Sequence, residues 1–395
     1  MNQAFSRRQF VMRAGYGAVV AGLGGALPRL ANASPLASDL LASGASPADA
    51  EKSPTAERKA GWAIVGLGKY ATQQIIPAFA DSKRSKLVAL VSGSPDKARA
   101  LADQNGVDPK NVYSYQNFDA IRDNPAVDIV YIILPNSLHA EYTVRGAKAG
   151  KHIISEKPMA TSVKDCQTMI DACQAANRKL MIGYRAQYEP FNLKAIEMAR
   201  GKQLGTLKLI TADHGRHLDP GDPADQWRMK KDLAGGGSLM DIGIYNLNAA
   251  RYLTGEEPIE LSAMLHSTPG DPRFREVEEN ASFTLRFPSG VIANCTSSYS
   301  YQDVKRYRVF GTDAWLDLDP ATEYYEHRMK IGHKDRQEEI KIKEESQFAR
   351  QMDHFSECVL DNKPVKTPGE EGLRDVRLMM AIYEAARTGK TVKLS

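Results

Sequence analysis

Short apolar runs alternate with helix-length segments over residues 61–184. The runs are rich in β-branched residues and have the length of strands: WAIV (62–65), LVALV (87–91), DIVYIIL (128–134), HIIS (152–155) and KLMIG (179–183). Between them lie a segment ending near Phe79 and segments 95–105, 137–149 and 162–177. Strands that are apolar along their length and alternate with helices predict a doubly wound parallel sheet. We therefore expect an α/β Rossmann domain over residues 61–184.

The pattern changes after Tyr188. A helix is expected near 190–203, then the strand TLKLITADH, a helix after GGGSLMDIGIY, and the strands IELSAMLH, ASFTLRF, VIANCTSSYS, YRVFGT, AWLDLD and EEIKIK. Turn signals at 288–290 and 311–313 predict an open, mostly antiparallel sheet with helices. Two helices, about 346–361 and 370–387, close the chain. We interpret 185–395 as an α+β domain that binds substrate and forms a homodimer or homotetramer.

The first residues read as an export signal. SRRQFV (6–11) fits the twin-arginine pattern, and a weakly apolar run follows from Ala14 to Pro28 with five glycines between positions 15 and 25. The alternative is a chance Arg-Arg pair before an ordinary secretory signal or a membrane anchor, but a spanning helix needs roughly 20 apolar residues. We expect a signal peptide over 1–33, a flexible arm over 34–60, and export of the folded protein to the periplasm.

Charge and cysteine content narrow the choice of partners. The net charge is +4, and residues 1–33 hold four arginines and no acid, so the remainder of the chain is neutral. A neutral chain gives no reason to expect nucleic acid as a partner, or a membrane once the signal is removed.

Cys166 and Cys173 lie about 10 Å apart along a predicted helix, too far for a disulfide. His214-x-x-His217 is read as loop, and we expect no metal site.

A glycine-rich turn follows the first strand. Gly66-Leu67-Gly68-Lys69-Tyr70-Ala71 is a G-x-G-x-x-A motif between a strand and a helix. Such glycines let the backbone approach a diphosphate that rests on the helix N-terminus. The motif is weak alone, but repeated strand–helix units surround it. The alternative is a glycine turn without ligand; we interpret residues 66–70 as part of a dinucleotide site.

The end of the second strand indicates which dinucleotide binds. NAD enzymes usually carry Asp or Glu there for the ribose hydroxyl. This chain has Ser92-Gly93-Ser94, with Lys97 one short turn further on. A carboxylate would repel a 2′-phosphate, whereas hydroxyls and an ammonium would bind it. The sequence therefore favours NADP over NAD.

Two further groups are candidates for chemistry. Lys157 follows the strand HIIS, so it should lie at the carboxyl edge of the sheet; the plain alternative is a surface lysine in a turn. Asp241 and Tyr245 are four residues apart and share one helix face. A carboxylate and a phenol so placed are often only part of a half-buried helix.

Several segments together resemble the glucose-fructose oxidoreductase family, with its aldose oxidoreductase members. They are GLGKYA, VSG with a following Lys, YIILPNSLHAE, EKPMATSV, LMIGYR, DPADQWR, LAGGGSLMDIGIY, GEEP, DPATEYY and PGEEGLRDVRL, spread over about 61–391. EKP alone marks a broad superfamily, whereas EKPMATSV with GGGSLMDIGIY is more specific. Two features depart from the family pattern: the chain stops at GKTVKLS, and loop 212–221 differs.

The resemblance implies roles for residues of the site. Lys157 would contact the nicotinamide ribose and the substrate, Asp241 would orient the sugar, and Tyr245 would be the acid/base. An adjacent ammonium is expected to lower the pKa of this phenol. The resemblance also implies further residues that line the cofactor cleft: Tyr115, Leu134, Pro135, Asn136, His139, Glu156, Arg185, Trp227 and Arg228.

The implied reaction is oxidation of the C1 hydroxyl of a cyclic aldose to an aldonolactone, followed by reduction of a second sugar to an alditol. Because the periplasm has no pool of free NADP, we expect a tightly bound cofactor that is recycled in place by a ping-pong scheme. The loop difference favours a second aldose over fructose as the acceptor. Alternatives are a dehydrogenase with exchangeable cofactor, a glycosidase that uses transient oxidation, and a non-catalytic sugar or redox sensor.

Overall fold

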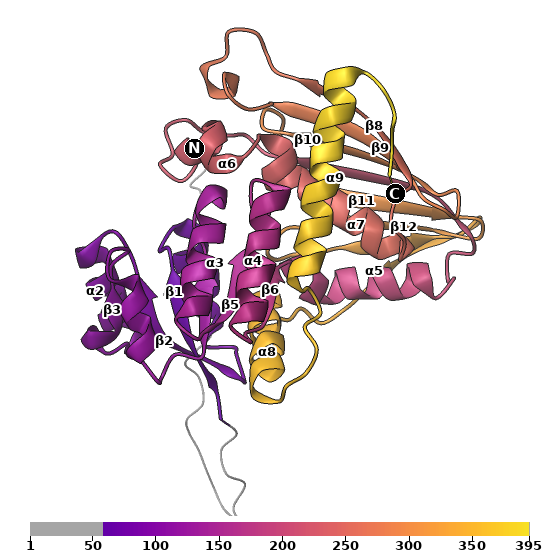
Figure 1. The fold of residues 1–395 in the computed structure, drawn as a ribbon. Coiled ribbons are helices and arrows are strands. Elements are labelled where there is room, and N and C mark those ends of the chain that lie inside the picture. The colour runs from indigo at the N-terminus through magenta and orange to yellow at the C-terminus, as the bar shows by residue number, and fades with distance from the viewer. Residues whose placement is uncertain (1–57, 395) are drawn as a thin grey trace, which may run out of the picture. The chain divides into compact units, whose positions relative to one another are not determined.

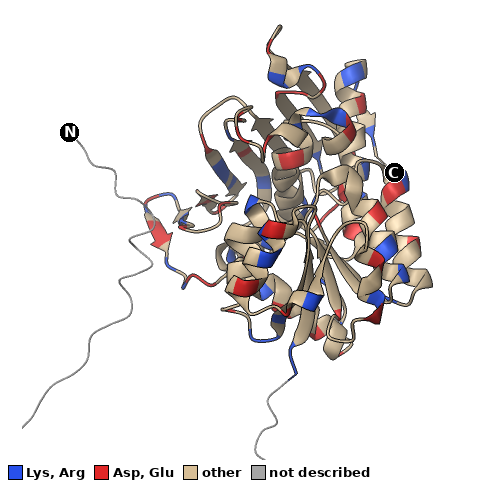
Figure 2. Ribbon diagram, turned by 90° about the vertical axis from the view of Figure 1, so that its left-hand side faces the viewer, with Lys and Arg blue, Asp and Glu red and all other residues tan. Residues whose placement is uncertain are grey.

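The computed structural model describes residues 58–394 (Figure 1). The predicted signal peptide and almost all of the predicted arm lie outside the described residues. Within the described range, no helix is long and apolar enough to cross a bilayer. Figure 2 shows Lys and Arg interspersed with Asp and Glu along the ribbon. The described cysteines, 166, 173, 295 and 358, are all buried and free, and Cys166 and Cys173 form no disulfide with each other, as predicted.

The first sheet has six parallel strands in the order β3-β2-β1-β4-β5-β6. They are β1 (Ala60–Val65), β2 (Ser85–Val91), β3 (Val112–Tyr113), β4 (Ile129–Ile132), β5 (His152–Glu156) and β6 (Leu180–Gly183). The predicted doubly wound sheet is confirmed. Chain order switches between β1 and β4, and ligands of such sheets bind outside the carboxyl ends of the strands at this point.

Helices cover both faces of this sheet (Figure 1). They are α1 (Ile76–Ala78), α2 (Pro95–Asn105), α3 (His139–Lys148), α4 (Val163–Ala175), α8 (Gln347–Leu360) and α9 (Gly369–Thr388). Side chains of a strand point alternately to the two faces. Trp62 and Ile64 therefore share a core with α1, α2 and α8, whereas Ala63 and Val65 belong to the core of α3, α4 and α9.

Helix α8 comes from the far end of the chain and completes the first of these cores. The indole Nε1 of Trp62 donates a hydrogen bond of 3.0 Å to the hydroxyl of Ser356. The Trp62 ring also packs edge-on against Phe355, with 6.2 Å between centroids. Ser346 begins the helix, because its hydroxyl accepts from the amide of Ala349 at 3.2 Å. One face of the parallel sheet is thus covered by residues that follow β7 to β14 in the chain.

The second sheet has nine strands in the order β14-β13-β12-β11-β7-β10-β9-β8-β15. They are β7 (Leu207–Gly215), β8 (Glu260–His266), β9 (Asn280–Arg286), β10 (Ile292–Ser298), β11 (Val304–Gly311), β12 (Trp315–Leu318), β13 (Met329–Gly332), β14 (Gln337–Ile340) and β15 (Val392–Lys393). Only the β7–β10 pair is parallel among these strands, so the mostly antiparallel prediction is confirmed. The remaining α-helices of the described range are α5 (Pro190–Arg200), α6 (Lys231–Ala234) and α7 (Ile244–Thr254).

Local details differ from the sequence interpretation. His214 lies inside β7 and is buried, so reading it as loop was wrong. The strand EEIKIK is reduced to β14, and the short strands β3, β13 and β15 were not predicted. Such short strands carry too few residues for a period-two pattern, and pairing with neighbours rather than local preference places them.

Candidate active site

The predicted site residues of the first domain come from loops at the carboxyl edge of its sheet. The turn 66–71 follows β1, the segment 134–139 follows β4, and Glu156 and Lys157 lie at the end of β5. The start of α7, with the turn 239–243 before it, reaches the same edge from the second domain. Lys157 Nζ donates a hydrogen bond of 2.6 Å to the backbone carbonyl of Asp241, which joins the two parts of the site.

The glycine turn fits the diphosphate of a dinucleotide. Gly66 has φ +94°, and a Cβ there would lie 2.2 Å from the carbonyl oxygen of Ile133, so only glycine is compatible with the turn. A Cβ on Gly68 would meet no heavy atom within 4 Å, which leaves its backbone open to a ligand. The Thr72 amide bonds to the Gly68 carbonyl at 3.0 Å as the helix begins. A helix N-terminus beside an open glycine is where phosphate groups bind.

The side chains of this turn have different surroundings. Leu67 is buried in the core of the first sheet. The Tyr70 ring packs 6.1 Å from Tyr324, and burial raises the pKa of its hydroxyl well above the usual value. Lys69 instead reaches toward the second domain and forms an ion pair with Asp222, in the loop after β7. Leu67 and Tyr70 thus hold the turn in place, while Lys69 links it to the other side of the site.

The predicted 2′-phosphate contacts surround the start of α2. Ser92 is buried, and its hydroxyl accepts from the amide of Ser94 at 3.1 Å. Lys97 is exposed on the first turn of α2. Tyr115 lies against Gly93, where a Cβ would be 3.0 Å from the ring. Asp96 is the acid on this turn, but its side chain is 98% exposed, so its charge is well solvated.

The segment after β4 is held by buried hydrogen bonds. Asn136 Nδ2 donates to the carbonyl of Ala234 at 2.8 Å. The His139 ring nitrogens lie 2.9 Å from the carbonyl oxygens of Leu134 and Pro158. Burial lowers the pKa of His139, so the neutral ring donates to one of these carbonyls. His139 therefore connects the Leu134-Pro135-Asn136 segment to the loop that carries Lys157.

Glu156 is partly buried beside Lys157. It accepts a hydrogen bond of 2.5 Å from the hydroxyl of Tyr131, and the Lys157 amide lies 3.3 Å from its second oxygen. Burial raises the pKa of Glu156, although Tyr131 and Lys157 act in the opposite direction. Gly183 leaves room for this carboxylate, because a Cβ there would be 2.8 Å from the Glu156 Oε1. Glu156 supports the Lys157 backbone from within the sheet.

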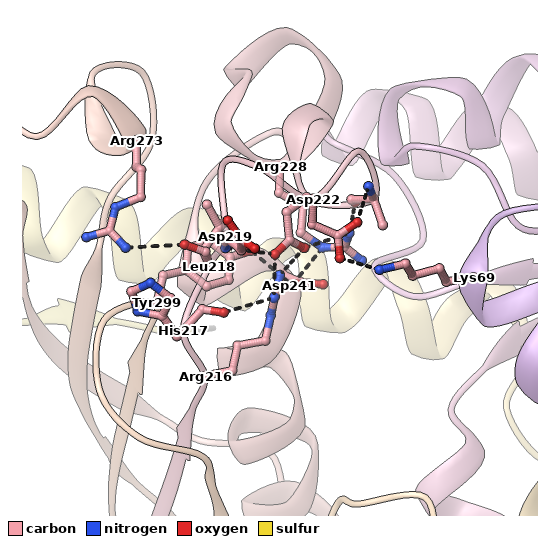
Figure 3. A network of polar contacts seen from close by, with 12 residues as sticks. Lys69, Arg216, His217, Leu218, Asp219, Asp222, Arg228, Asp241, Arg273 and Tyr299 are labelled. Carbon is pink, nitrogen blue, oxygen red and sulfur yellow. Dashed lines mark hydrogen bonds and ion pairs between the residues drawn. The ribbon is translucent and has the colours of Figure 1, made fainter. Parts of the chain in front are cut away.

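Asp241 lies among three cations and a phenol. Its Oδ2 is 3.0 Å from Arg228 Nε and 3.6 Å from Arg216 (Figure 3). Lys157 Nζ is 3.8 Å from its Oδ1. The Tyr299 hydroxyl donates to Oδ2 at 3.0 Å. Burial opposes the charged form, but the cations and this hydrogen bond hold the pKa of Asp241 well below its usual range. Asp241 is therefore an ionised hydrogen-bond acceptor.

Tyr245, in the first turn of α7, lies between aromatic and cationic groups. The His214 ring stacks on it at 5.1 Å, and Lys157 Nζ and the Arg185 guanidinium lie 4.5 Å and 5.0 Å from its ring centroid. Arg185 is fixed by the carbonyls of Thr322 and Glu323 at 2.6 Å and 3.0 Å.

Burial raises the pKa of Tyr245, and Arg185 opposes this shift only in part. The prediction that a neighbouring ammonium lowers this pKa is therefore wrong in net direction. The physical reason is the burial of the phenol, which disfavours the phenolate more than the nearby cations favour it.

The structure brings Lys157, Asp241 and Tyr245 together, and Arg228 joins them through Asp241. Trp227 lies next to this group, with the Arg228 guanidinium 4.4 Å from its ring. Sequence reasoning missed the other neighbours of the site: Arg216, Tyr299, Asp225 and the stacking of His214 on Tyr245. His214 and Arg216 lie at the end of β7, Asp225 in the loop after it, and Tyr299 just after β10. Their spacing in the sequence does not indicate that they share a site.

Comparison with known proteins places this arrangement in a family. The model for the oxidoreductase family with an NAD-binding Rossmann fold matches residues 60–184, and the GFO/IDH/MocA C-terminal domain matches residues 192–317. The fold and site are those of a dinucleotide-dependent oxidoreductase. The chain belongs to the GFO/IDH/MocA oxidoreductase family, as the resemblance in its sequence predicted.

Individual relatives cover most of the chain. Aldose-aldose oxidoreductase from Caulobacter crescentus, in a crystal structure with glycerol, is 50% identical with a TM-score of 0.82, over 85% of this chain and 100% of its own. D-xylose 1-dehydrogenase [NADP(+)] of Haloarcula marismortui is 30% identical, over 90% of this chain and 99% of the relative. A second D-xylose 1-dehydrogenase (NADP(+)), from Haloferax volcanii, is 29% identical over 84% of this chain and 98% of the relative.

Proposed function

We propose that this protein is an NADP-dependent sugar oxidoreductase that oxidises C1 of cyclic aldoses and reduces a second sugar. The observation that carries the proposal is the convergence of Lys157, Asp241 and Tyr245 beside the turn 66–71. The 50% identity to an aldose-aldose oxidoreductase supports aldoses as both donor and acceptor. The departures in loop 212–221 still favour an aldose acceptor over fructose.

The residues divide the chemistry between them. Asp241, ionised, accepts hydrogen bonds from sugar hydroxyls and orients the ring. Tyr245 takes the proton of the C1 hydroxyl as hydride leaves C1, which gives an aldonolactone. In the reverse direction, the neutral phenol gives its proton to the carbonyl oxygen of an open-chain sugar, which gives an alditol. Because burial raises the pKa of Tyr245, reduction uses its resting form, and oxidation should accelerate as pH rises.

NADP is the proposed cofactor. Bound NADP supplies the acceptor and donor of hydride. The open backbone at Gly68 would hold its diphosphate, and Ser92, Ser94 and Lys97 would hold its 2′-phosphate. The Asp96 carboxylate of the same turn is 98% exposed and lies 3.5 Å from the Arg99 guanidinium, so solvent and Arg99 offset its charge. The NADP(+) named for the two xylose dehydrogenases supports this assignment.

We further propose that the cofactor stays bound through both half-reactions and that the protein acts in the periplasm. Residues 6–11 support export by the twin-arginine route, which carries folded proteins. Since the periplasm offers no free NADP, one sugar must reduce the cofactor and a second must reoxidise it.

The test uses protein purified without added nucleotide. Mass analysis of the released small molecules should show NADP(H) bound to the protein. Incubation with glucose alone should then give gluconate and sorbitol without added nucleotide. A parallel incubation with glucose and fructose separates the acceptors, because sorbitol that appears only with fructose would contradict the aldose preference. Absence of bound NADP(H) would contradict cofactor retention.

A conventional dehydrogenase is the second candidate. The identity to two D-xylose 1-dehydrogenases with NADP(+) favours it. Such an enzyme would exchange its cofactor, so xylose or glucose would be oxidised only when free NADP is supplied. Turnover measured with and without added NADP, at equal enzyme concentration, decides between the two.

We also propose a homodimer or homotetramer formed through the second sheet. Met264 on β8 is 77% exposed and Ile292 on β10 is 40% exposed. The pairing of both strands with β9 puts these two side chains on the same sheet face. Light scattering should give twice or four times the chain mass, and a monomer would contradict the proposal.

A further inference from the structure

Both ends of the loop after β7 are bonded near Asp241, on the side of the site where we place the sugar. We call residues 216–228 the clasp segment. Both terminal nitrogens of Arg216 bond to the Asp225 carboxylate, at 2.9 Å and 2.8 Å. At the other end, Arg228 Nε bonds to Asp241 at 3.0 Å. These contacts fix both ends of the clasp segment next to the proposed sugar-orienting carboxylate (Figure 3).

The tip of the clasp segment presents one carboxylate to the nucleotide side. The Asp222 amide donates to the carbonyl of Asp219 at 3.1 Å, and Asp222 Oδ1 accepts from the amide of Ala224 at 3.0 Å. The other oxygen, Oδ2, pairs with the Lys69 ammonium. Hydrogen bonds within its own loop thus orient the Asp222 side chain toward Lys69.

Lys69 lies next to the proposed diphosphate site. Lys69 follows Gly68, whose backbone is open where the diphosphate would rest. The Lys69–Asp222 pair therefore joins the turn under the cofactor to a loop from the opposite domain. A dinucleotide bound at Gly68 would lie beside this bridge, and separating the two sides would require the pair to break.

We propose that Asp222 is a cofactor-retaining residue, which holds the clasp segment closed over the nucleotide turn through Lys69. The inference rests on the proposed NADP function and adds a residue that slows cofactor release. Both partners are partly exposed, with side-chain exposures of 59% for Lys69 and 25% for Asp222. Exposed pairs of this kind change equilibria by about 1.5- to 5-fold, so the expected effect on release is of that size.

The experiment measures release of NADPH from loaded protein, by its fluorescence, after dilution into excess NADP. Asp222→Asn removes the charge but keeps an oxygen for the Ala224 amide. The matched control is Glu276→Gln, which removes an exposed ion pair of 2.8 Å with Lys230, next to the clasp segment. Asp222→Asn should release NADPH about 1.5- to 5-fold faster than wild type, and the control should match wild type.

Ionic strength supplies a second readout that a merely structural role would not change. Raising salt from about 0.02 M to about 0.5 M screens exposed pairs, so wild type should approach the release rate of Asp222→Asn. Unchanged or slower release in Asp222→Asn overturns the inference, because Asp222 would then be inert or compete with phosphate for Lys69. If wild type does not bind NADPH at all, both the proposed function and the role of Asp222 are overturned. If wild type binds NADPH, the release rates test the role of Asp222 alone.

Discussion

Replacing Asp241 with Asn tests the electrostatics of the site most directly. The substitution keeps the shape of the side chain and an acceptor for the Tyr299 hydroxyl but removes one negative charge. Three cations lie within 4 Å of this carboxylate, the nearest at 3.0 Å. Each attraction is about 4 kcal/mol at an effective dielectric constant near 20, and desolvation of the carboxylate offsets much of the sum. Removing one partner of a buried ion pair costs about 3–5 kcal/mol, so we expect the free energy of unfolding to fall by about 3 kcal/mol.

The loss should depend on pH in a defined direction. The folded state lowers the pKa of Asp241, so its stabilisation is fully present above the unfolded pKa of about 3.9. It is lost as pH falls through the lower folded value. The difference between wild type and Asp241→Asn should therefore be constant from about pH 5 to pH 8 and shrink only in stronger acid.

Urea unfolding at several pH values measures this difference. Asp108→Asn is the matched control, because Asp108 and its partner Lys110, 2.9 Å away, are both exposed. Exposed pairs contribute about 0–1 kcal/mol, so the control should change little. The reasoning is refuted if Asp241→Asn costs no more than the control, or if its cost grows as pH falls.

Three further predictions concern single side chains. Tyr245→Phe should lower kcat by about 10²–10⁴-fold while bound NADP(H), measured by absorbance, is retained; activity equal to wild type would remove Tyr245 as acid/base. Gly66→Ala should destabilise the fold more than Gly106→Ala in thermal unfolding. Both glycines have positive φ, but only at Gly66 would a Cβ strike the Ile133 carbonyl, at 2.2 Å; equal losses would contradict the clash. Ser92→Asp should weaken NADP relative to NAD by roughly 2 kcal/mol in binding titrations, and an unchanged preference would mean that the 2′-phosphate lies elsewhere.

The architecture was readable from the sequence where local patterns decide it. Apolar strands that alternate with helices gave the parallel sheet, and the G-x-G-x-x-A motif gave the turn after β1. The second sheet was predicted in type but not in strand order. The parallel β7–β10 pair joins strands far apart in the chain, and no local pattern encodes it.

The candidate site was readable only in part. Lys157, Asp241 and Tyr245 came from motifs, and the structure brings them together. Arg216 and Tyr299 contact Asp241 because β7 and β10 lie side by side, which the sequence does not reveal. The direction of the Tyr245 pKa shift was also beyond the sequence, since it depends on how deeply the phenol is buried.

The hydrogen bond between Trp62 and Ser356 has a consequence for the order of folding during synthesis. Domains near the N-terminus usually fold as soon as they leave the ribosome. Here one face of the parallel sheet, with Trp62 fully buried, is covered by α8, which is made after both sheets are almost complete. We therefore expect the nucleotide-binding half to reach its final packing only after α8 has left the ribosome. Until then, the part of this face that α8 covers is open to solvent, whereas α1 and α2 already cover the rest.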